Sequence, residues 1–225
     1  MPANFCFKAF LIVTILLACP MLPAAEEVLR AIQLPAPQTA GGRPLMQVLK
    51  DRHSYRDFSA QNLPDQMFSN LLWAAYGVNR PDSGGRTAPS ARNWQETDIY
   101  VARYDGLFLY DAKANELKPV LPEDIRGATG LQPFVKDAPV NLVFVADYSK
   151  MGKNESDNAT WSAADASFIS QNVYLFCASE GLATVVRGMV DRPTLAKAMG
   201  LRDDQRVVLA QSVGYPQASV KAYGN

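Results

Sequence analysis

The segment DNATWSAADASFISQNVYLFCASEG, residues 157–181, decides the fold because it is the longest stretch whose apolar residues recur at helical spacing. We predict one long helix over 157–181. A helix of this length must lie against most of the domain, so its apolar side should face the core. The side chains expected on that buried side are Trp161, Ala164, Phe168, Val173, Leu175 and Phe176.

Shorter elements are predicted on both sides of this helix. Helices are expected over 44–50, 64–76 and 192–199, where apolar residues also follow a helical period. Strands are expected over 98–103, 107–110, 140–146 and 206–213, with 185–186 beginning a strand or an extended link. Helices thus alternate irregularly with strands, which favours an α+β fold: a mostly antiparallel central sheet flanked by helices. Residues 79–92 form a Gly/Pro/Ser-rich loop long enough to suggest a function.

Composition indicates a globular protein with no affinity for nucleic acid. The chain has 225 residues, of which 48% are hydrophobic and 20% charged, and its formal net charge is zero. No basic tract is present that would bind a phosphate backbone. We expect a single domain over 44–225, preceded by a spacer over 26–43 that is rich in Ala, Pro, Gln and Gly.

The first 25 residues have the pattern of an export signal. The apolar run from Ala9 to Ala18 follows one basic residue and is too short for a comfortable membrane span. Leu16-Leu17-Ala18-Cys19 resembles a bacterial lipobox, in which a lipidated Cys19 would tether the protein to a membrane. Ordinary cleavage near Ala24-Ala25 and a retained N-terminal anchor are the alternatives. The expected location is the periplasm or cell envelope.

Several chemistries are excluded by what the sequence lacks. His53 is the one histidine, and two of the three cysteines lie in the leader, so a zinc site made by the protein alone is not expected. The nucleophile elbow G-x-S-x-G, the P-loop and the fingerprint G-x-G-x-x-G are all absent. Cys177 lies in the long apolar helix and is expected to be a buried core residue. If the protein is an enzyme, a bound cofactor must supply the chemistry, and we name no catalytic side chain and no metal.

The segment DRHSYRDF, residues 51–58, carries the first candidate ligands. In an extended chain the period of two places Arg52, Ser54 and Arg56 on one side. Two guanidinium groups and a hydroxyl at one locus suit a phosphate together with a second anionic group. A solvated basic helix end is the alternative for this segment.

Four motifs in order resemble those of the nitroreductase family. The R-x-S-x-R pattern at 52–56 is followed by APSARNWQ at 88–95, EGLATVVRG at 180–188 and VGYP at 213–216. The first is similar to the family's opening FMN motif, and the second to its A-P-S-x-x-N-x-Q loop. The resemblance covers residues 44–216 and is closest to the compact branch that includes the thiazole- and oxazole-forming dehydrogenases. It implies an FMN-binding, intertwined homodimer with the nitroreductase-like fold.

The resemblance also implies roles for individual residues. Arg52 and Ser54 would hold the FMN phosphate, and Arg56 would lie at the N1–C2 carbonyl edge of the flavin, where positive charge favours the reduced state. The backbone N–H of Arg187 or Gly188 would face flavin N5. The remaining cofactor ligands are His53 within the first motif, Pro89, Ser90 and Asn93 reaching a flavin bound mainly by the other subunit, Gln132 at the pyrimidine edge, and Lys221 as a phosphate ligand.

The function implied is an FMN-dependent oxidoreductase that transfers hydride between NAD(P)H or another donor and an unidentified small molecule. An exported protein does not meet cytosolic NAD(P)H, so a quinone or another envelope redox protein would also fit. Two alternatives remain: a flavin dehydrogenase that oxidises a small molecule or peptide heterocycle, and a non-enzymatic flavin-binding envelope protein.

Overall fold

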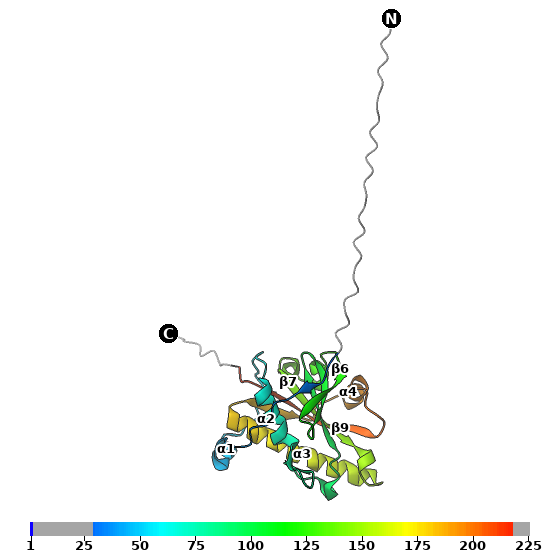
Figure 1. Cartoon of the computed structure of the whole chain (residues 1–225). Coiled ribbons are helices and arrows are strands. Elements are labelled where there is room, and N and C mark those ends of the chain that lie inside the picture. Colours follow the sequence, from blue (N-terminus) through cyan, green and yellow to red (C-terminus); the bar gives the residue numbers. More distant parts are fainter. Residues whose placement is uncertain (2–28, 218–225) are drawn as a thin grey trace.

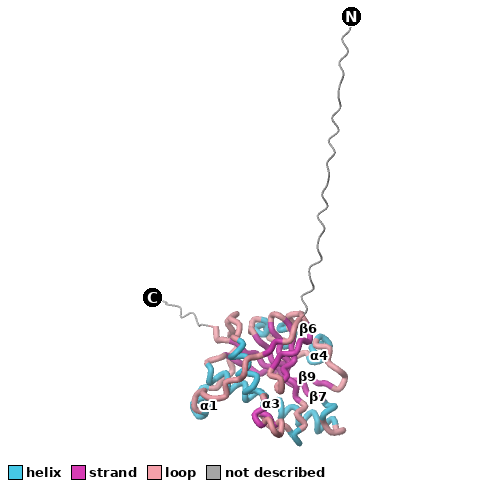
Figure 2. Tube along the Cα trace, viewed as in Figure 1, coloured by secondary structure: helices cyan, strands magenta, loops and turns pink. Residues whose placement is uncertain are grey.

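A computed structural model describes Met1 and residues 29–217 of the chain. These residues form a seven-stranded sheet of order β1-β6-β5-β4-β7-β9-β8, in which every neighbouring pair is antiparallel. Figure 2 shows the strands gathered in the centre with helices around them. The predicted α+β class is confirmed. The strands are β1 (Ile32–Gln33), β4 (Thr97–Arg103), β5 (Gly106–Asp111), β6 (Glu116–Leu121), β7 (Val140–Asp147), β8 (Ala183–Arg187) and β9 (Gln205–Gly214).

Helices cover both faces of this sheet (Figure 1). Helices α2 (Asp65–Tyr76) and α3 (Glu155–Glu180) share a core with Val101 of β4 and Phe144 of β7. The next residues along the same strands, Ala102 and Val145, pack with α4 (Arg192–Ala198) on the other face. This alternation follows from the period of two in a strand, and it explains why β7 is apolar without interruption. Helix α1 (Leu45–Asp51) packs against α3, and β2 (Val78–Arg80) with β3 (Gly85–Arg86) forms a separate hairpin.

The orientation of α3 corrects one prediction. Trp161 and Phe168, expected on the buried side, are 48% and 49% exposed. The face that α3 turns to the sheet carries Ile169 and Val173, together with buried polar side chains such as Asp165. Both faces of α3 contain apolar residues, so helical spacing alone could not identify the inner face.

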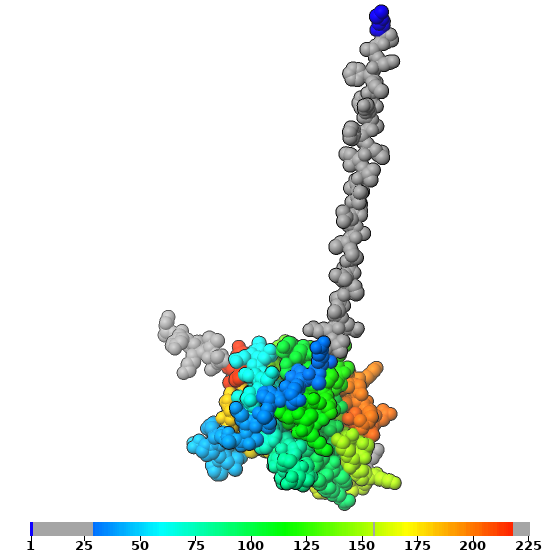
Figure 3. Space-filling model, in the orientation of Figure 1, coloured from blue at the N-terminus to red at the C-terminus, as the bar shows by residue number. Residues whose placement is uncertain are grey.

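Part of the predicted spacer belongs to the folded body. Residues 32–33 pair with β6, and Leu34 is buried. The Ser69 hydroxyl of α2 donates to the carbonyl of Pro35 at 2.5 Å, and the backbone N–H of Gln38 donates to Asn70 Oδ1 at 2.8 Å. Figure 3 shows this N-terminal stretch crossing the outside of the domain. The hydrogen bonds that replace water for this backbone explain why a segment rich in Pro and Gly is held in place.

Two groups of predictions fall outside the described residues. Apart from Met1, they are the leader, with its lipobox, and Lys221. Among the helices that the structure describes, none is long and apolar enough to cross a membrane.

Candidate functional site

The segment from Arg52 to Phe58 meets the edge of β8 at Tyr55, and its end, Phe58, pairs with Pro216 after β9. The backbone N–H of Tyr55 donates to the carbonyl of Thr184 at 2.9 Å, so the segment continues the sheet for one bond. Ser54 Oγ is hydrogen-bonded to Tyr174 Oη at 2.7 Å, and the Arg52 guanidinium lies over the Tyr174 ring at 5.1 Å from its centroid. The structure therefore places Arg52 and Ser54 on the same side of the segment, against α3.

The other members of this motif are exposed. Arg56 is exposed, and within residues 29–217 neither Arg56 nor Arg52 has a carboxylate within 4 Å. His53 is turned differently: its Nδ1 lies 2.7 Å from the carbonyl oxygen of Asp51, and its ring meets Tyr55 edge-on at 5.9 Å. His53 lines a neighbouring cavity of about 290 Å³ between α1, the end of α3 and the start of β8. Two uncompensated guanidinium groups thus remain available to an anion.

The edge of β8 offers one backbone donor. Val186 N–H points outward to Tyr174 Oη at 3.0 Å, while Arg187 pairs with Ala210 of β9. Because N–H groups alternate along a strand, the Arg187 N–H lies in the ladder and the Gly188 N–H points outward. No described residue accepts a hydrogen bond from the Gly188 N–H, and Gly188 itself is exposed. Of the two predicted donors, Gly188 is the free one.

The Arg187 side chain instead builds the support behind this edge. It is 3% exposed, and its Nη1 and Nη2 donate to the carbonyl of Thr129 at 2.6 Å and to Asn141 Oδ1 at 2.9 Å. Burial lowers the pKa of Arg187 to about 10. Gly130 makes room for it, since a Cβ there would lie 1.9 Å from Nη1.

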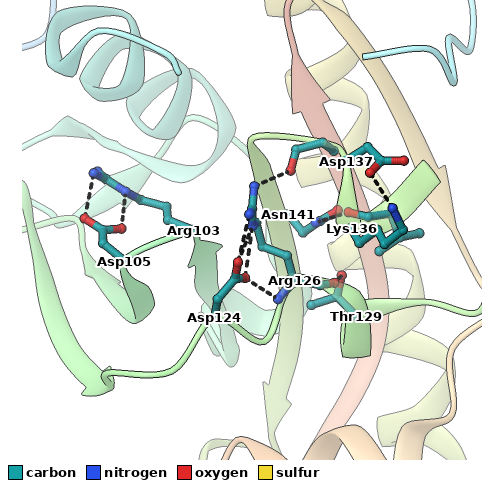
Figure 4. Close-up of polar contacts among 10 residues, drawn as sticks. Arg103, Asp105, Asp124, Arg126, Thr129, Lys136, Asp137 and Asn141 are labelled. Carbon is teal, nitrogen blue, oxygen red and sulfur yellow. Dashed lines mark hydrogen bonds and ion pairs between the residues drawn. The ribbon is translucent and has the colours of Figure 1, made fainter. Parts of the chain in front are cut away.

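This support fixes the segment that carries Gln132. The backbone N–H of Leu131 donates to the carbonyl of Met189 at 3.1 Å, so residues 131–132 run beside residues 188–189. Gln132 Oε1 is buried and has no hydrogen-bond partner among the described residues. Figure 4 shows polar contacts of the residues that precede this segment, in which the Arg126 guanidinium reaches Asp124 and the Thr129 hydroxyl donates to the carbonyl of Arg126. Gln132 and Gly188 are thus brought together, as the motifs require.

The predicted loop at Pro89, Ser90 and Asn93 lies elsewhere in the same chain. The backbone N–H of Ala91 donates to Asp165 Oδ2 at 2.8 Å. Asp165 is nine residues before Tyr174 on α3, which corresponds to about 13 Å along the helix. Within one copy of the chain, the loop and the pair Arg52 and Ser54 therefore lie at different places along α3.

Sequence reasoning missed two contributors, Tyr174 and the buried pair Glu96 and Asp165. Tyr174 is the common partner of Arg52, Ser54 and Val186. The sequence pattern that could have identified it is a tyrosine among the apolar residues of a helix, because the hydroxyl of a buried tyrosine needs a hydrogen-bond partner. No group of three or more His, Cys, Asp or Glu side chains that could hold a metal ion occurs in the described part of the chain.

Comparisons with known proteins show which family and fold the chain resembles. The model of the nitroreductase family matches residues 49–215. A provisionally designated nitroreductase of Methanocaldococcus jannaschii is 30% identical over 155 residues, which are 64% of this chain and 78% of that protein. A crystal structure of a provisionally designated nitroreductase from Ralstonia eutropha JMP134 is 43% identical, with a TM-score of 0.82, and the match covers 89% of this chain and 97% of that one.

A more distant solved structure shares the fold. It is the NADPH:FMN oxidoreductase of Vibrio harveyi in complex with NAD+, which is 20% identical, with a TM-score of 0.58. The match covers 77% of this chain and 69% of the Vibrio protein.

Proposed function

The chain belongs to the nitroreductase family of oxidoreductases, and on this premise we propose that it binds FMN and transfers hydride between a donor and a small-molecule acceptor. One observation carries the proposal: within residues 29–217, the two guanidinium groups of the segment that meets the edge of β8 have no carboxylate partner, and the Gly188 N–H just after β8 has no acceptor. The family gives NAD(P)H as the first donor to test. The Vibrio protein, which has the same fold, is named for NADPH and FMN and was crystallised with NAD+.

The residues present fit FMN. Arg52 and Ser54 supply a cation and a hydroxyl for the phosphate, and both are held by Tyr174. Gly188 N–H is a donor with no acceptor in the described residues, as flavin N5 requires, and the orphaned Gln132 Oε1 is an acceptor suited to an imide N–H. Bound FMN would supply the two-electron chemistry.

The protein's own part in the reaction is electrostatic and positional. Arg56 holds positive charge where the reduced cofactor carries negative charge, and one such pair at about 4 Å is worth on the order of 4 kcal/mol at an effective dielectric near 20. Solvent screens the exposed Arg56, so the net effect on the reduction potential is smaller. Gly188 orients the ring through its N–H. No side chain is required as an acid or a base.

A second copy of the chain completes the site in this proposal. The point on α3 midway between Asp165 and Tyr174 lies near residues 169–170. A two-fold axis there would bring the Ser90–Asn93 loop of one copy opposite Arg52 and Ser54 of the other. Phe168, about half exposed, lies on α3 close to that axis, and Trp161, also about half exposed, lies about two turns away on the same outer face. An exposed aromatic pair at this place supports an isologous interface.

Two finer points extend the proposal. We infer from residues 1–25 that the protein is exported, in which case a quinone or an envelope redox protein replaces NAD(P)H as the partner. We also place the chain in the compact branch of the family, on the motifs that resemble the thiazole- and oxazole-forming dehydrogenases.

An absorbance spectrum of the purified protein tests the function. We expect a flavin spectrum, or uptake of added FMN, with bleaching when one of NADH, NADPH or a quinol is titrated without oxygen. Arg52→Ala should weaken FMN binding by at least tenfold, since a charged hydrogen bond is worth about 1.5–3 kcal/mol. Arg80→Ala removes an exposed arginine of β2 and is the control. Colourless protein that takes up no FMN would refute the proposal.

A further inference from the structure

The loop that joins β3 to β4 is held in a strained conformation. Three of its non-glycine residues have left-handed backbones: Arg92 with φ 51°, Asn93 with φ 55° and Gln95 with φ 48°. Each such residue costs on the order of 1 kcal/mol or more, so the loop keeps this shape only because its surroundings fix it. Asn93, together with Pro89 and Ser90 of the same loop, is one of the residues that, under the proposed function, reach a flavin bound by the second copy.

Two buried carboxyl groups fix the loop. Asp165 of α3 accepts the backbone N–H of Ala91 at 2.8 Å. Glu96 accepts the Ser90 hydroxyl at 3.2 Å, and Ser90 Oγ in turn accepts the backbone N–H of Gln95 at 2.8 Å. Glu96 is 0% exposed and Asp165 is 3% exposed. Since Ser90 and Ala91 are adjacent, the two carboxyl groups accept hydrogen bonds from neighbouring residues of one turn.

No cation neutralises this pair. Within residues 29–217, no Lys, Arg or His nitrogen lies within 4 Å of a carboxylate oxygen of Glu96 or Asp165. The other charged or titratable groups nearby are the Tyr76 phenol and Arg86, whose guanidinium lies over the Tyr76 ring at 5.0 Å and donates to Gln95 Oε1. The Tyr76 hydroxyl is buried without a hydrogen-bond partner in this part of the chain.

Two adjacent ionised carboxylates in such a place would be costly. Burial disfavours each charge, and the two charges repel each other. Burial raises the pKa of Glu96 above its ordinary value of 4.5, and Asp165 adds to the rise. The Thr97 and Ser90 hydroxyls donate to Glu96 at 3.2 Å each and oppose this rise in pKa, but the effect of burial is larger.

We propose that Glu96 and Asp165 are positioning residues that hold one proton between them and thereby set the Ser90–Asn93 loop in the shape that meets the second copy's flavin. The neutral Glu96 carboxyl holds Ser90, and the Asp165 carboxylate holds Ala91. This inference rests on the proposed function for its effect on FMN, while the shared proton is a property of the folded chain alone.

The sign of the pH effect follows from the raised pKa. The unfolded chain releases the Glu96 proton near pH 4.5, and the folded chain releases it only at higher pH. The contribution to folding is therefore fully present below about pH 4.5 and is lost as pH rises through the folded-state pKa. Loss of the proton places two charges beside Ser90 and Ala91, which releases the strained loop and weakens FMN binding.

Three variants and one control distinguish the effect of the Glu96 proton from the effect of the side chain's size and hydrogen bonds. Glu96→Gln keeps the hydrogen-bond geometry without a titrating group, Glu96→Ala removes both, and Asp165→Asn removes the repulsion. Glu123→Gln makes the same chemical change at an exposed position. The FMN dissociation constant is measured by flavin fluorescence from pH 5 to pH 9, and the urea midpoint is measured for the same proteins without FMN.

We expect the FMN dissociation constant of the parent, divided by that of Glu96→Gln, to be lowest at the acid end of the pH range. Once Glu96 ionises in the FMN-free protein, the ratio should rise by up to about tenfold per pH unit until Glu96 also ionises in the complex. Taking the ratio cancels the titration of the FMN phosphate. In Asp165→Asn the FMN dissociation constant should increase less with pH, because the repulsion between the two carboxylates is removed. Glu96→Ala should bind FMN weakly at every pH. Glu123→Gln should match the parent.

Two results would overturn the inference. If Glu96→Gln binds FMN as weakly as Glu96→Ala at pH 5, the carboxyl acts as a charge and not as a neutral group. If the urea midpoint of Glu96→Gln falls with pH as steeply as that of the parent, no proton is held at Glu96. The second measurement needs no flavin, so it judges the shared proton even if the parent binds no FMN, in which case the proposed function is what fails.

Discussion

Replacement of Phe168 by glutamate tests whether the outer face of α3 is an interface between two copies. Phe168 is 49% exposed in the single chain. A phenylalanine side chain offers about 200 Å² in total, so roughly 100 Å² remains to be buried by a partner. At about 25 cal/mol per Å², that area is worth about 2.5 kcal/mol per copy.

The two-fold symmetry of the proposed dimer doubles this figure. Phe168→Glu should cost about 5 kcal/mol of association free energy, which is more than a thousandfold in the dimer dissociation constant. Burying the new carboxylates near the axis adds to the loss, because they repel each other. The fold of the single chain should persist, since Phe168 does not belong to the core clusters.

Sedimentation velocity over a range of concentrations measures the change, and circular dichroism checks the fold. Tyr104→Glu is the matched control, because Tyr104 is 53% exposed in the turn between β4 and β5, away from α3. FMN binding should weaken together with association, since the Ser90–Asn93 loop of one copy then no longer contacts the flavin bound by the other. A Phe168→Glu protein that dimerises like the parent would show that α3 does not form the interface.

Two further outcomes concern the support of the site. Gly130→Ala should lower the unfolding free energy in urea by about 1–3 kcal/mol, because its Cβ would meet the fixed Arg187 guanidinium at 1.9 Å. Gly127→Ala, whose Cβ would have its nearest neighbour at 3.7 Å, should change it little, and equal losses would contradict this reasoning. Cys177 should resist alkylation in the native protein, because it is fully buried and burial raises the pKa of its thiol. Peptide mass spectrometry after native labelling checks this, and modification of Cys177 at the rate seen in urea would refute it.

The sheet and its helices were largely readable from the sequence, because the period of apolar residues is a local property. The apolar run at 140–146 predicted the central strand β7, and the Tyr104-Asp105-Gly106 signal predicted the turn between β4 and β5. Strand β6 was missed because it contains Lys118 and Pro119. Pro119 is tolerated there since β1 pairs only with residues 116–117, which leaves this part of β6 without a neighbour on one side.

The site was predictable only in part, because its pieces are fixed by contacts distant in sequence. The side shared by Arg52 and Ser54 followed from the period of two. Tyr174 and Asp165 each form a hydrogen bond with a residue more than 70 positions away, and no local sequence pattern predicts such a contact. The choice between the N–H groups of Arg187 and Gly188 depended on which side of β8 pairs with β9, and that is a fact of topology.

The error over Trp161 and Phe168 has a physical origin that bears on the function. An apolar stripe on a helix indicates burial, but it does not tell which molecule provides the cover. In α3 the inner face holds Ile169 and Val173 together with buried polar residues such as Asp165, and the outer face holds Trp161 and Phe168. Aromatic groups of this size are usually turned inward on a helix whose outer side faces water. The second copy that we propose would cover these two half-exposed aromatic groups, so the mistaken prediction and the proposed interface concern the same side chains.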